Sequence, residues 1–290
     1  VMERTLFHGT NSYFIPNVKM TAYSCKTNLP PNTAFRGFGG PQGMFVIESA
    51  LSHAAKELGI PTHELQKLNL LKNGNEFPYG QIADGVELNS IWHEMESKFD
   101  IGSIEKEIDE FNSSHTNVKK GFSLMPVTFG ISFTKTPMNQ ARALVHIYTD
   151  GSVGVSTGAV EMGQGVNTKM LQIAACIFSI DPKQVKLEST NTTRVANTSP
   201  SAASSTADLN GKALQKACNA LLERLKSCAA DHLKVSSTDV TLKDGMVYTN
   251  ENKTDLTWDQ LVMMAFLKRI CLTENGHYAT PTIHFDMTKE

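Results

Sequence analysis

The chain has 290 residues, which is long for one average domain and fits two modest ones. A hydrophobic content of 40%, a charged content of 19% and a formal net charge of −2 describe an ordinary globular protein, so composition gives no reason to expect nucleic acid or an anionic membrane as a partner. The sequence has no apolar run of the roughly 20 residues that a membrane span needs.

The first part of the chain is predicted to be mostly helical. Residues 2–11 look helical, and the polar residues 9–34 contain Pro30 and Pro31, which exclude a central strand or a helix interior there. Apolar residues then recur at helical spacing, with Gly59 as a stop for the first helix. The expected helices cover residues 41–59, 61–71, 88–99 and 102–115, with a loop over 73–87.

A polar run at residues 112–121 marks the expected domain boundary. Domain 1 is predicted to cover residues 1–118 and domain 2 residues 119–290, as two parts of one larger binding region. Beyond the boundary the apolar pattern changes to alternation, which is typical of strands. Strands are expected over residues 121–133, 143–163 and 184–192.

Two Asp-Gly pairs are expected to form hairpin turns, one at Asp150 and Gly151 and the other at Asp244 and Gly245. Because hairpins join antiparallel strands, the pattern favours an α+β fold with mixed or antiparallel sheets and packed helices over a doubly wound parallel sheet. The helices of this part are expected over residues 167–179 with Asn167 or Thr168 as the cap, from about 204 to 233, and over 257–270 starting at Thr257 or Asp259.

Three segments of small residues stand directly before helices. They are "FRGFGGPQG" at residues 35–43, "EMGQG" at 161–165 and "SPSAAS" at 199–204. Each can direct several backbone N–H groups to one point, as anion-binding loops do. One such segment is usually only a turn. Three in one chain, with an arginine and two glutamines, predict a large polar ligand with many oxygen atoms.

Several familiar sites are excluded by the motifs. The chain has no G-x-x-x-x-G-K-[ST], no G-x-S-x-G, and no G-x-G-x-x-G, because Gln42 stands where the third glycine of that frame would be. None of the nine histidines has a partner at i, i+4, so we do not expect a metal site built from protein ligands. Five scattered cysteines without a C-x-x-C pair predict reduced thiols in a cytoplasmic protein.

Five longer motifs carry a resemblance to a known family. They are "TNLPPNTAFRGFGGPQGMFVIES", "FGISFT", "YTDGSVGVSTGAVEMGQG", "TKMLQIA" and "NTSPSAASSTADLNG". Together they resemble the molybdopterin-binding region of the xanthine dehydrogenase and aldehyde oxidase family, and within it the xanthine dehydrogenases. The resemblance runs over essentially the whole chain and is weakest at residues 73–120 and 229–258.

The resemblance implies molybdopterin, carrying molybdenum, as the cofactor. Arg36, Gly37 and Phe38 would line the molybdenum side, and Arg36 and Ala203 would lie near the metal without being its ligands. The rest of the implied cofactor-binding set is Met162, Gly163, Gln164, Ala202, Ala203, Ser204 and Thr206. Small side chains at these positions suit the close approach of a phosphate and several oxygens.

The resemblance also implies four substrate-binding residues, for a purine. Phe38 and Phe133 would hold the ring by stacking and edge-on contact, Thr134 would add a hydrogen bond, and Arg4 would pair with a purine oxygen and stabilise negative charge. Sequence alone offers a core residue on a strand as the alternative for Phe133 and a solvated helix arginine as the alternative for Arg4. Phe38 lies between two glycines and has little local packing to gain.

The implied reaction converts hypoxanthine and xanthine to urate, by hydroxylating a ring carbon with oxygen from water. The catalytic glutamate of the family belongs to a G-E-P-P-type segment, which this sequence lacks, and a second glutamate belongs upstream of Val1. Glu161 and Glu188 match neither motif, so no catalytic residue is expected in this chain. We therefore expect a fragment that is inactive alone and works with the rest of the molybdenum region, 2Fe-2S clusters, FAD and NAD.

Two other functions fit the sequence less well. The first is an aldehyde or N-heterocycle oxidase of the same family, because the distinction depends largely on Arg4. The second is a non-catalytic α+β domain that only scaffolds subunits, for which Arg36, Gln164 and Ala203 would lie on separate faces.

Overall fold

The structure of the protein is a computed structural model that describes residues 1–31 and 36–285. Contacts divide the chain into two compact units, Val1–Gly130 and Ile131–Glu290, which we call unit 1 and unit 2. The predicted division at residue 118 concerns cofactor-binding subdomains, and it stays a prediction. Among the described residues, no helix combines the length and the apolar character that crossing a bilayer requires.

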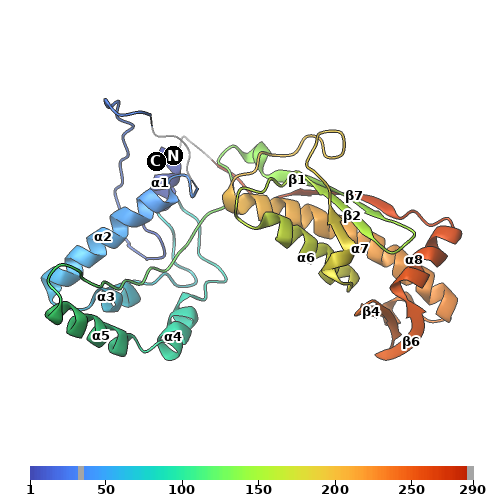
Figure 1. The fold of residues 1–290 in the computed structure, drawn as a ribbon. Coiled ribbons are helices and arrows are strands. Elements are labelled where there is room, and N and C mark those ends of the chain that lie inside the picture. Colours follow the sequence, from blue (N-terminus) through green and yellow to red (C-terminus); the bar gives the residue numbers. More distant parts are fainter. Residues whose placement is uncertain (32–35, 286–290) are drawn as a thin grey trace. The chain divides into compact units, whose positions relative to one another are not determined.

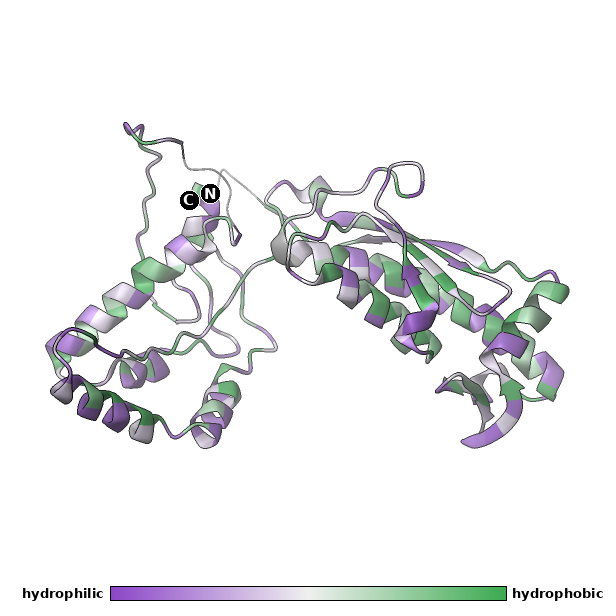
Figure 2. Cartoon of the chain, in the orientation of Figure 1, coloured by the Kyte–Doolittle hydropathy of each residue, from purple (hydrophilic) through white to green (hydrophobic). Residues whose placement is uncertain are grey.

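Unit 1 consists of helices joined by long irregular segments (Figure 1). The helices are α1 (Met2–Phe7), α2 (Gly40–Leu58), α3 (Thr62–Leu68), α4 (Leu88–Lys98) and α5 (Ile101–Ser114). The helices expected from apolar spacing are therefore confirmed. Gly59 ends α2 as predicted, because its left-handed conformation at φ 66° favours glycine. Hydrophobic and hydrophilic residues alternate along α4 and α5, as in amphipathic helices (Figure 2).

Two glycines of the "FRGFGGPQG" segment let α1 approach the start of α2 closely. A Cβ atom on Gly39 would overlap the carbonyl oxygen of Val1. A Cβ atom on Gly43 would overlap the carbonyl oxygen of Thr5. Because backbone atoms cannot move aside as a flexible side chain can, glycine is needed at both positions for α1 to pack where it does.

A polar cluster around Glu48 of α2 joins the parts of unit 1. The carboxylate of Glu48 accepts hydrogen bonds from Asn11 Nδ2 at 2.9 Å, Tyr13 Oη at 2.8 Å and Gln66 Nε2 at 2.7 Å. Burial and the bond to Glu48 raise the pKa of Tyr13 well above its usual value, so the phenol stays protonated and keeps donating. The cluster therefore gives the donors of Asn11, Tyr13 and Gln66 an acceptor within unit 1.

The strand predicted over residues 121–133 is wrong. This segment has no regular secondary structure and belongs to no sheet. Its backbone oxygens are bound by side chains instead: Gln66 Nε2 donates to the carbonyl of Leu124 at 2.8 Å, and Asn11 Nδ2 donates to that of Pro126 at 2.7 Å. Because Pro126 has no N–H and side chains already satisfy neighbouring carbonyls, the alternating pattern does not lead to a ladder.

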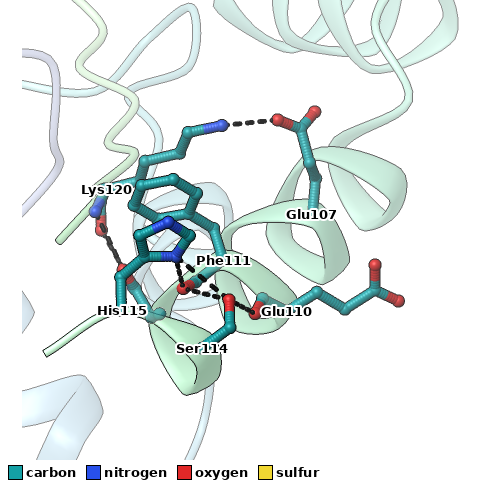
Figure 3. A network of polar contacts seen from close by, with 7 residues as sticks. Glu107, Glu110, Phe111, Ser114, His115 and Lys120 are labelled. Carbon is teal, nitrogen blue, oxygen red and sulfur yellow. Dashed lines mark hydrogen bonds and ion pairs between the residues drawn. The ribbon is translucent and has the colours of Figure 1, made fainter. Parts of the chain in front are cut away.

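The polar run after α5 folds back onto that helix (Figure 3). Lys120 Nζ lies 2.7 Å from a carboxylate oxygen of Glu107 and 4.6 Å from the ring centroid of Phe111. The Phe111 ring stacks on that of His115, with centroids 3.9 Å apart. The side chain of Asn112 binds both the N–H and the carbonyl of Lys120. The run is therefore an ordered turn rather than an open linker.

Unit 2 combines helices with two sheets (Figure 1). The larger sheet has the strand order β3-β2-β1-β7 and the smaller one β4-β5-β6. The strands are β1 (Gln140–Ile147), β2 (Val153–Thr157), β3 (Val185–Leu187), β4 (Val240–Lys243), β5 (Met246–Thr249), β6 (Asn252–Thr257) and β7 (Thr273–Ala279). The helices are α6 (Val166–Phe178), α7 (Ala203–Leu233) and α8 (Trp258–Leu267), with short 3-10 turns at Thr136–Met138, Pro182–Gln184 and Ser237–Asp239.

The predicted α+β fold is confirmed. β1 pairs antiparallel with β2 and β7, whereas β2 and β3 are parallel, so the larger sheet is mixed. Both Asp-Gly hairpins form: Gly151, at φ 82°, lies in the turn between β1 and β2, and Asp244 and Gly245 join β4 to β5. Helices α6 and α7 lie side by side against the larger sheet, where they bury the main apolar core.

Three local predictions for unit 2 need correction. The strand expected over residues 184–192 covers only the three residues of β3. Strands β6 and β7 are absent from the prediction, because their sequences are polar and their alternation is weak. Neither Asn167 nor Thr168 caps α6, whose N-cap is Gly165 in a left-handed conformation.

Candidate functional site

Arg4 lies on α1, and its guanidinium contacts Gly130 and Phe129. Nη2 donates to the carbonyl oxygen of Gly130, and Cζ lies 5.5 Å from the ring centroid of Phe129 in a cation–π contact. Burial lowers the pKa of Arg4, while the nearby Tyr79 opposes that shift. The guanidinium still stays charged at neutral pH. Arg4 is therefore a partly buried cation with a hydrogen bond and a cation–π contact, and not a fully solvated helix arginine.

The turn before α2 presents an aromatic ring from a strained backbone. Phe38 has φ 45°, between Gly37 at φ 91° and Gly39 at φ 104°. A left-handed phenylalanine is uncommon and costs about 1–3 kcal/mol. Phe38 is 47% exposed, so core packing does not offset that cost. A side chain held this way fits contact with a ligand, and Arg36, also exposed, stands directly before the turn.

In unit 2, two of the small-residue segments lie next to each other. We call them the 158–165 loop and the 197–206 loop. The N–H of Val160 donates to Ser201 Oγ at 2.8 Å, and the side chain of Thr198 fills the space where a Cβ atom on Gly158 would lie. The two loops, far apart in sequence, thus contact each other just after β2, at Gly158 and Val160.

The loop that carries Phe133 and Thr134 is hydrogen-bonded to the 197–206 loop. Ser199 Oγ donates to the carbonyl of Met138 in this loop. The buried Asn139 fixes its backbone: Oδ1 accepts from the N–H of Phe133 at 2.7 Å, and Nδ2 donates to the carbonyl of Phe133 at 3.0 Å. Phe133 is partly buried and lies on no strand, which removes the core-strand alternative. Thr134 is also partly buried.

Backbone N–H groups of the 158–165 loop donate to the side chain of Glu161, which lies within the same loop. Its carboxylate accepts hydrogen bonds from the N–H groups of Gly163 at 2.9 Å, Gly165 at 2.9 Å and Asn167 at 3.0 Å. These bonds, that of Asn167 foremost, lower the pKa of Glu161. Gln164 Nε2 binds the carbonyl of Val160 at 2.9 Å. The outer side of the loop stays open, because a Cβ atom on Gly163 would meet nothing within 4 Å.

The start of α7 has the features of a site for an oxygen-rich group. The hydroxyls of Thr198 and Thr206 are buried and, within the described part of the chain, have no hydrogen-bond partner. An unpaired buried hydroxyl costs about 1–3 kcal/mol, so a bound acceptor would relieve it. Ala202 is the N-cap, without a side-chain cap among the described residues. The side chains of Ala203 and Ser204 lie outside the described part.

The carboxylates of Glu161 and Glu188 already have partners. Glu188 lies 3.2 Å from Lys186 Nζ and 3.1 Å from Arg194 Nη1, and Glu161 holds the start of α6. Over residues 1–31 and 36–285, no group of three or more His, Cys, Asp or Glu side chains could hold a metal ion. All five thiols are free.

Two family models match the chain, and both are described as a molybdopterin cofactor-binding domain. One covers residues 1–70 and the other residues 94–290. The chain belongs to the molybdopterin cofactor-binding domain family. Molybdopterin carries a phosphate and several ring oxygens and nitrogens, so the unpaired Thr206 hydroxyl and the open start of α7 fit this cofactor. The cofactor predicted from the motifs is confirmed.

The relatives of this molybdopterin-binding chain agree with the predicted family. It is 40% identical over 285 residues to a xanthine dehydrogenase/oxidase of Felis catus, and 38% identical over 285 residues to a xanthine dehydrogenase of Dictyostelium discoideum. Both alignments cover 98% of this chain, but only 20% and 19% of the relatives. The chain thus spans about a fifth of their length.

Solved structures show the same fold. Quinoline 2-oxidoreductase from Pseudomonas putida aligns with a TM-score of 0.77 at 19% identity, over 96% of this chain and 38% of its own. The aldehyde oxidoreductase from Desulfovibrio desulfuricans aligns with a TM-score of 0.67 at 19% identity, over 98% of this chain and 28% of its own. Both similarities concern the architecture of the molybdopterin-binding domain.

Sequence reasoning missed the residues that hold the site residues in place. His8 and Asn139 do so from within the loops and helices of their own units, and Glu161 orders the 158–165 loop. His8 and Asn139 belong to none of the motifs quoted from the sequence, whereas Glu161 opens the "EMGQG" segment. Only Glu161 gave a local signal, as a carboxylate just before a helix start, where N–H groups need an acceptor.

Proposed function

We propose that this chain is part of a molybdenum hydroxylase that oxidises hypoxanthine and xanthine to urate. The observation that carries the proposal is Arg4, a fastened and partly desolvated cation at the position that the family resemblance assigns to purine binding. The identity of 40% to a xanthine dehydrogenase/oxidase over nearly the whole chain supports it. A cation held this way suits the recognition of a purine oxygen and of the charge that builds on the ring.

The residues of this chain would bind and orient the two ligands. Phe38 and Phe133 would hold the purine between their rings, and Thr134 would donate or accept one hydrogen bond. The molybdenum centre, when bound, supplies the oxygen atom and accepts the electrons. The remaining residues proposed to contact the cofactor are Arg36, Gly37, Met162, Gly163, Gln164, Ala202, Ala203, Ser204 and Thr206.

The rest of the enzyme would lie outside this chain. The chain spans about a fifth of its curated relatives, so the catalytic glutamate and the remaining molybdenum region are proposed partners. Iron–sulfur clusters of the 2Fe-2S type, FAD and NAD would carry the electrons onward. In this proposal the chain supplies part of a site and no turnover of its own, and the cytoplasmic location expected from its cysteines stays a prediction.

The test is the substitution Arg4→Met in the full-length enzyme. We expect kcat/KM for xanthine to fall by about 100- to 1000-fold, the usual loss for one donor to developing charge, with little change for an aromatic aldehyde. Arg142→Met, at an exposed position of β1, is the matched control and should change neither value. An enzyme that oxidises aldehydes but never xanthine would be the aldehyde or N-heterocycle oxidase. If the purified full-length protein contained no molybdenum, the alternative of a non-catalytic scaffold domain would be favoured.

A further inference from the structure

His8 closes a ring of hydrogen bonds around Arg4. Its Nδ1 lies 2.6 Å from the carbonyl oxygen of Arg4, and its Nε2 lies 3.1 Å from the backbone nitrogen of Gly130. The carbonyl of Gly130 in turn accepts from the Arg4 guanidinium. The same peptide segment therefore receives the Arg4 side chain and donates to His8.

These partners define the proton positions on the imidazole. The Gly130 N–H can only donate, so Nε2 must be the acceptor. The Arg4 carbonyl can only accept, so Nδ1 must carry the proton. His8 is thus a neutral ring with both nitrogens used. Burial lowers its pKa and so does the charge of Arg4, although the bond to the Arg4 carbonyl opposes them.

The Phe129 ring contacts the side chains of both His8 and Arg4. Its ring centroid lies 4.7 Å from that of His8 and 5.5 Å from Arg4 Cζ. The ring also packs closely on α2, because a Cβ atom on Gly40 would lie only 2.5 Å from it. His8 itself is buried, at 3% exposure. The Arg4 guanidinium therefore packs on Phe129, whose position His8 helps to determine.

The segment that holds Arg4 needs this support because no strand pairs with it. Residues 121–133 have no regular secondary structure and join no sheet. The side chains of Arg4 and His8 bind the Gly130 peptide instead. Asn11, close to His8 in sequence, accepts from the Thr128 N–H at 3.2 Å. Removing His8 would free the Gly130 peptide to rotate, and the acceptor of Arg4 would move with it.

We propose that His8 is a positioning residue that sets the Arg4 guanidinium for substrate recognition through the Gly130 peptide. The inference rests on the proposed role of Arg4 in binding purines. It predicts that the loss of His8 damages the oxidation of xanthine specifically. A side chain that still accepts a bond from the Gly130 N–H should restore function.

The experiment compares variants of the full-length enzyme, purified with their cofactor. His8→Phe keeps an aromatic ring of similar shape without the hydrogen bonds, and should lower kcat/KM for xanthine by about 10- to 100-fold, the scale of a small misplacement of a binding group. The value for an aromatic aldehyde should stay within about twofold. His8→Gln, which places an acceptor near Nε2, should recover most of the loss. His8→Asn, which is shorter, should not.

A double variant shows whether His8 acts through Arg4. Adding His8→Phe to Arg4→Met should cause no further loss on xanthine, and every variant should contain as much molybdenum as the parent. Equal losses on both substrates, additive losses in the double variant, or lost molybdenum would show a merely structural role and overturn the inference. Full activity of Arg4→Met on xanthine would overturn the proposed function as well, whereas a strong Arg4→Met defect with an unaffected His8→Phe would overturn this inference alone.

Discussion

Glycines near the site serve packing as much as flexibility. Gly39 and Gly43 lie where a Cβ atom would overlap backbone oxygens of α1, the helix that carries Arg4. The "FRGFGGPQG" segment thus does two things. It turns the chain at Phe38, and it lets α1 lie against the start of α2. Sequence reasoning explained the first and missed the second, because the contacting residues Val1 and Thr5 lie 38 positions before Gly39 and Gly43.

A substitution at Gly43 separates packing from backbone freedom, because Gly43 is an ordinary helical residue of α2. Gly43→Ala should lower the free energy of unfolding of unit 1 by about 1–3 kcal/mol, the usual cost of overpacking. Urea unfolding, followed by hydrogen exchange of peptides from α1 and α2, measures it. Gly102→Ala in α5 is the control. Its Cβ atom would meet nothing closer than 3.6 Å, so we expect a gain of about 0.4–1 kcal/mol. A neutral Gly43→Ala would refute the packing role.

At the scale of single elements, the sequence predicted correctly those features that depend on contacts between residues close in sequence. The end of α2 at Gly59, the two Asp-Gly hairpins and the start of α8 at Thr257 all involve neighbours within a few residues. The wrong predictions concern segments whose structure depends on contacts with residues distant in sequence. Residues 121–133 alternate like a strand, but Asn11 and Gln66 already bind their backbone. β7 pairs with β1, more than 100 residues earlier.

The same reason limits what sequence shows of the site. Motifs pointed to Phe38 and the small-residue loops, and the family resemblance pointed to Arg4. They gave no hint that Gly130 holds Arg4 or that Asn139 fixes the backbone of Phe133, since a single backbone carbonyl or a lone asparagine leaves no pattern. Sequence motifs therefore propose the site residues, whereas the contacts that support them become visible only in the folded chain.

The cap of α8 offers a test at this scale. Thr257 Oγ1 accepts from the N–H of Gln260 at 3.2 Å, and Gln260 Oε1 accepts from the N–H of Thr257 at 2.9 Å, which is a capping box. Thr257→Ala should destabilise unit 2 by about 1 kcal/mol, measured by urea unfolding with hydrogen exchange of α8 peptides. Thr257→Ser keeps the acceptor and should retain nearly full stability. An equal loss in both variants would show that the methyl group matters more than the cap.

At the scale of the whole molecule, the two units have very different cores. The core of unit 2 is one continuous cluster that runs through β1, β2, α6, α7 and α8. The described part of unit 1 has two small clusters instead, Tyr13 with Leu70 and Trp92, and Leu71 with Phe77 and Ala83. Because apolar burial is the main stabilising contribution, unit 1 should be the less stable of the two. Its polar clusters then matter more for keeping Arg4 in place.

We therefore expect the chain to unfold in two steps. Hydrogen exchange along a urea titration should show the peptides of α1–α5 opening at lower urea than those of α7, β1 and β7. Leu70→Ala and Leu225→Ala remove matched buried side chains, one from each unit, and each should cost about 2–5 kcal/mol. Each should shift only the transition of its own unit, since the units are separate clusters of contacts. A single shared transition, moved equally by either substitution, would show one cooperative structure instead.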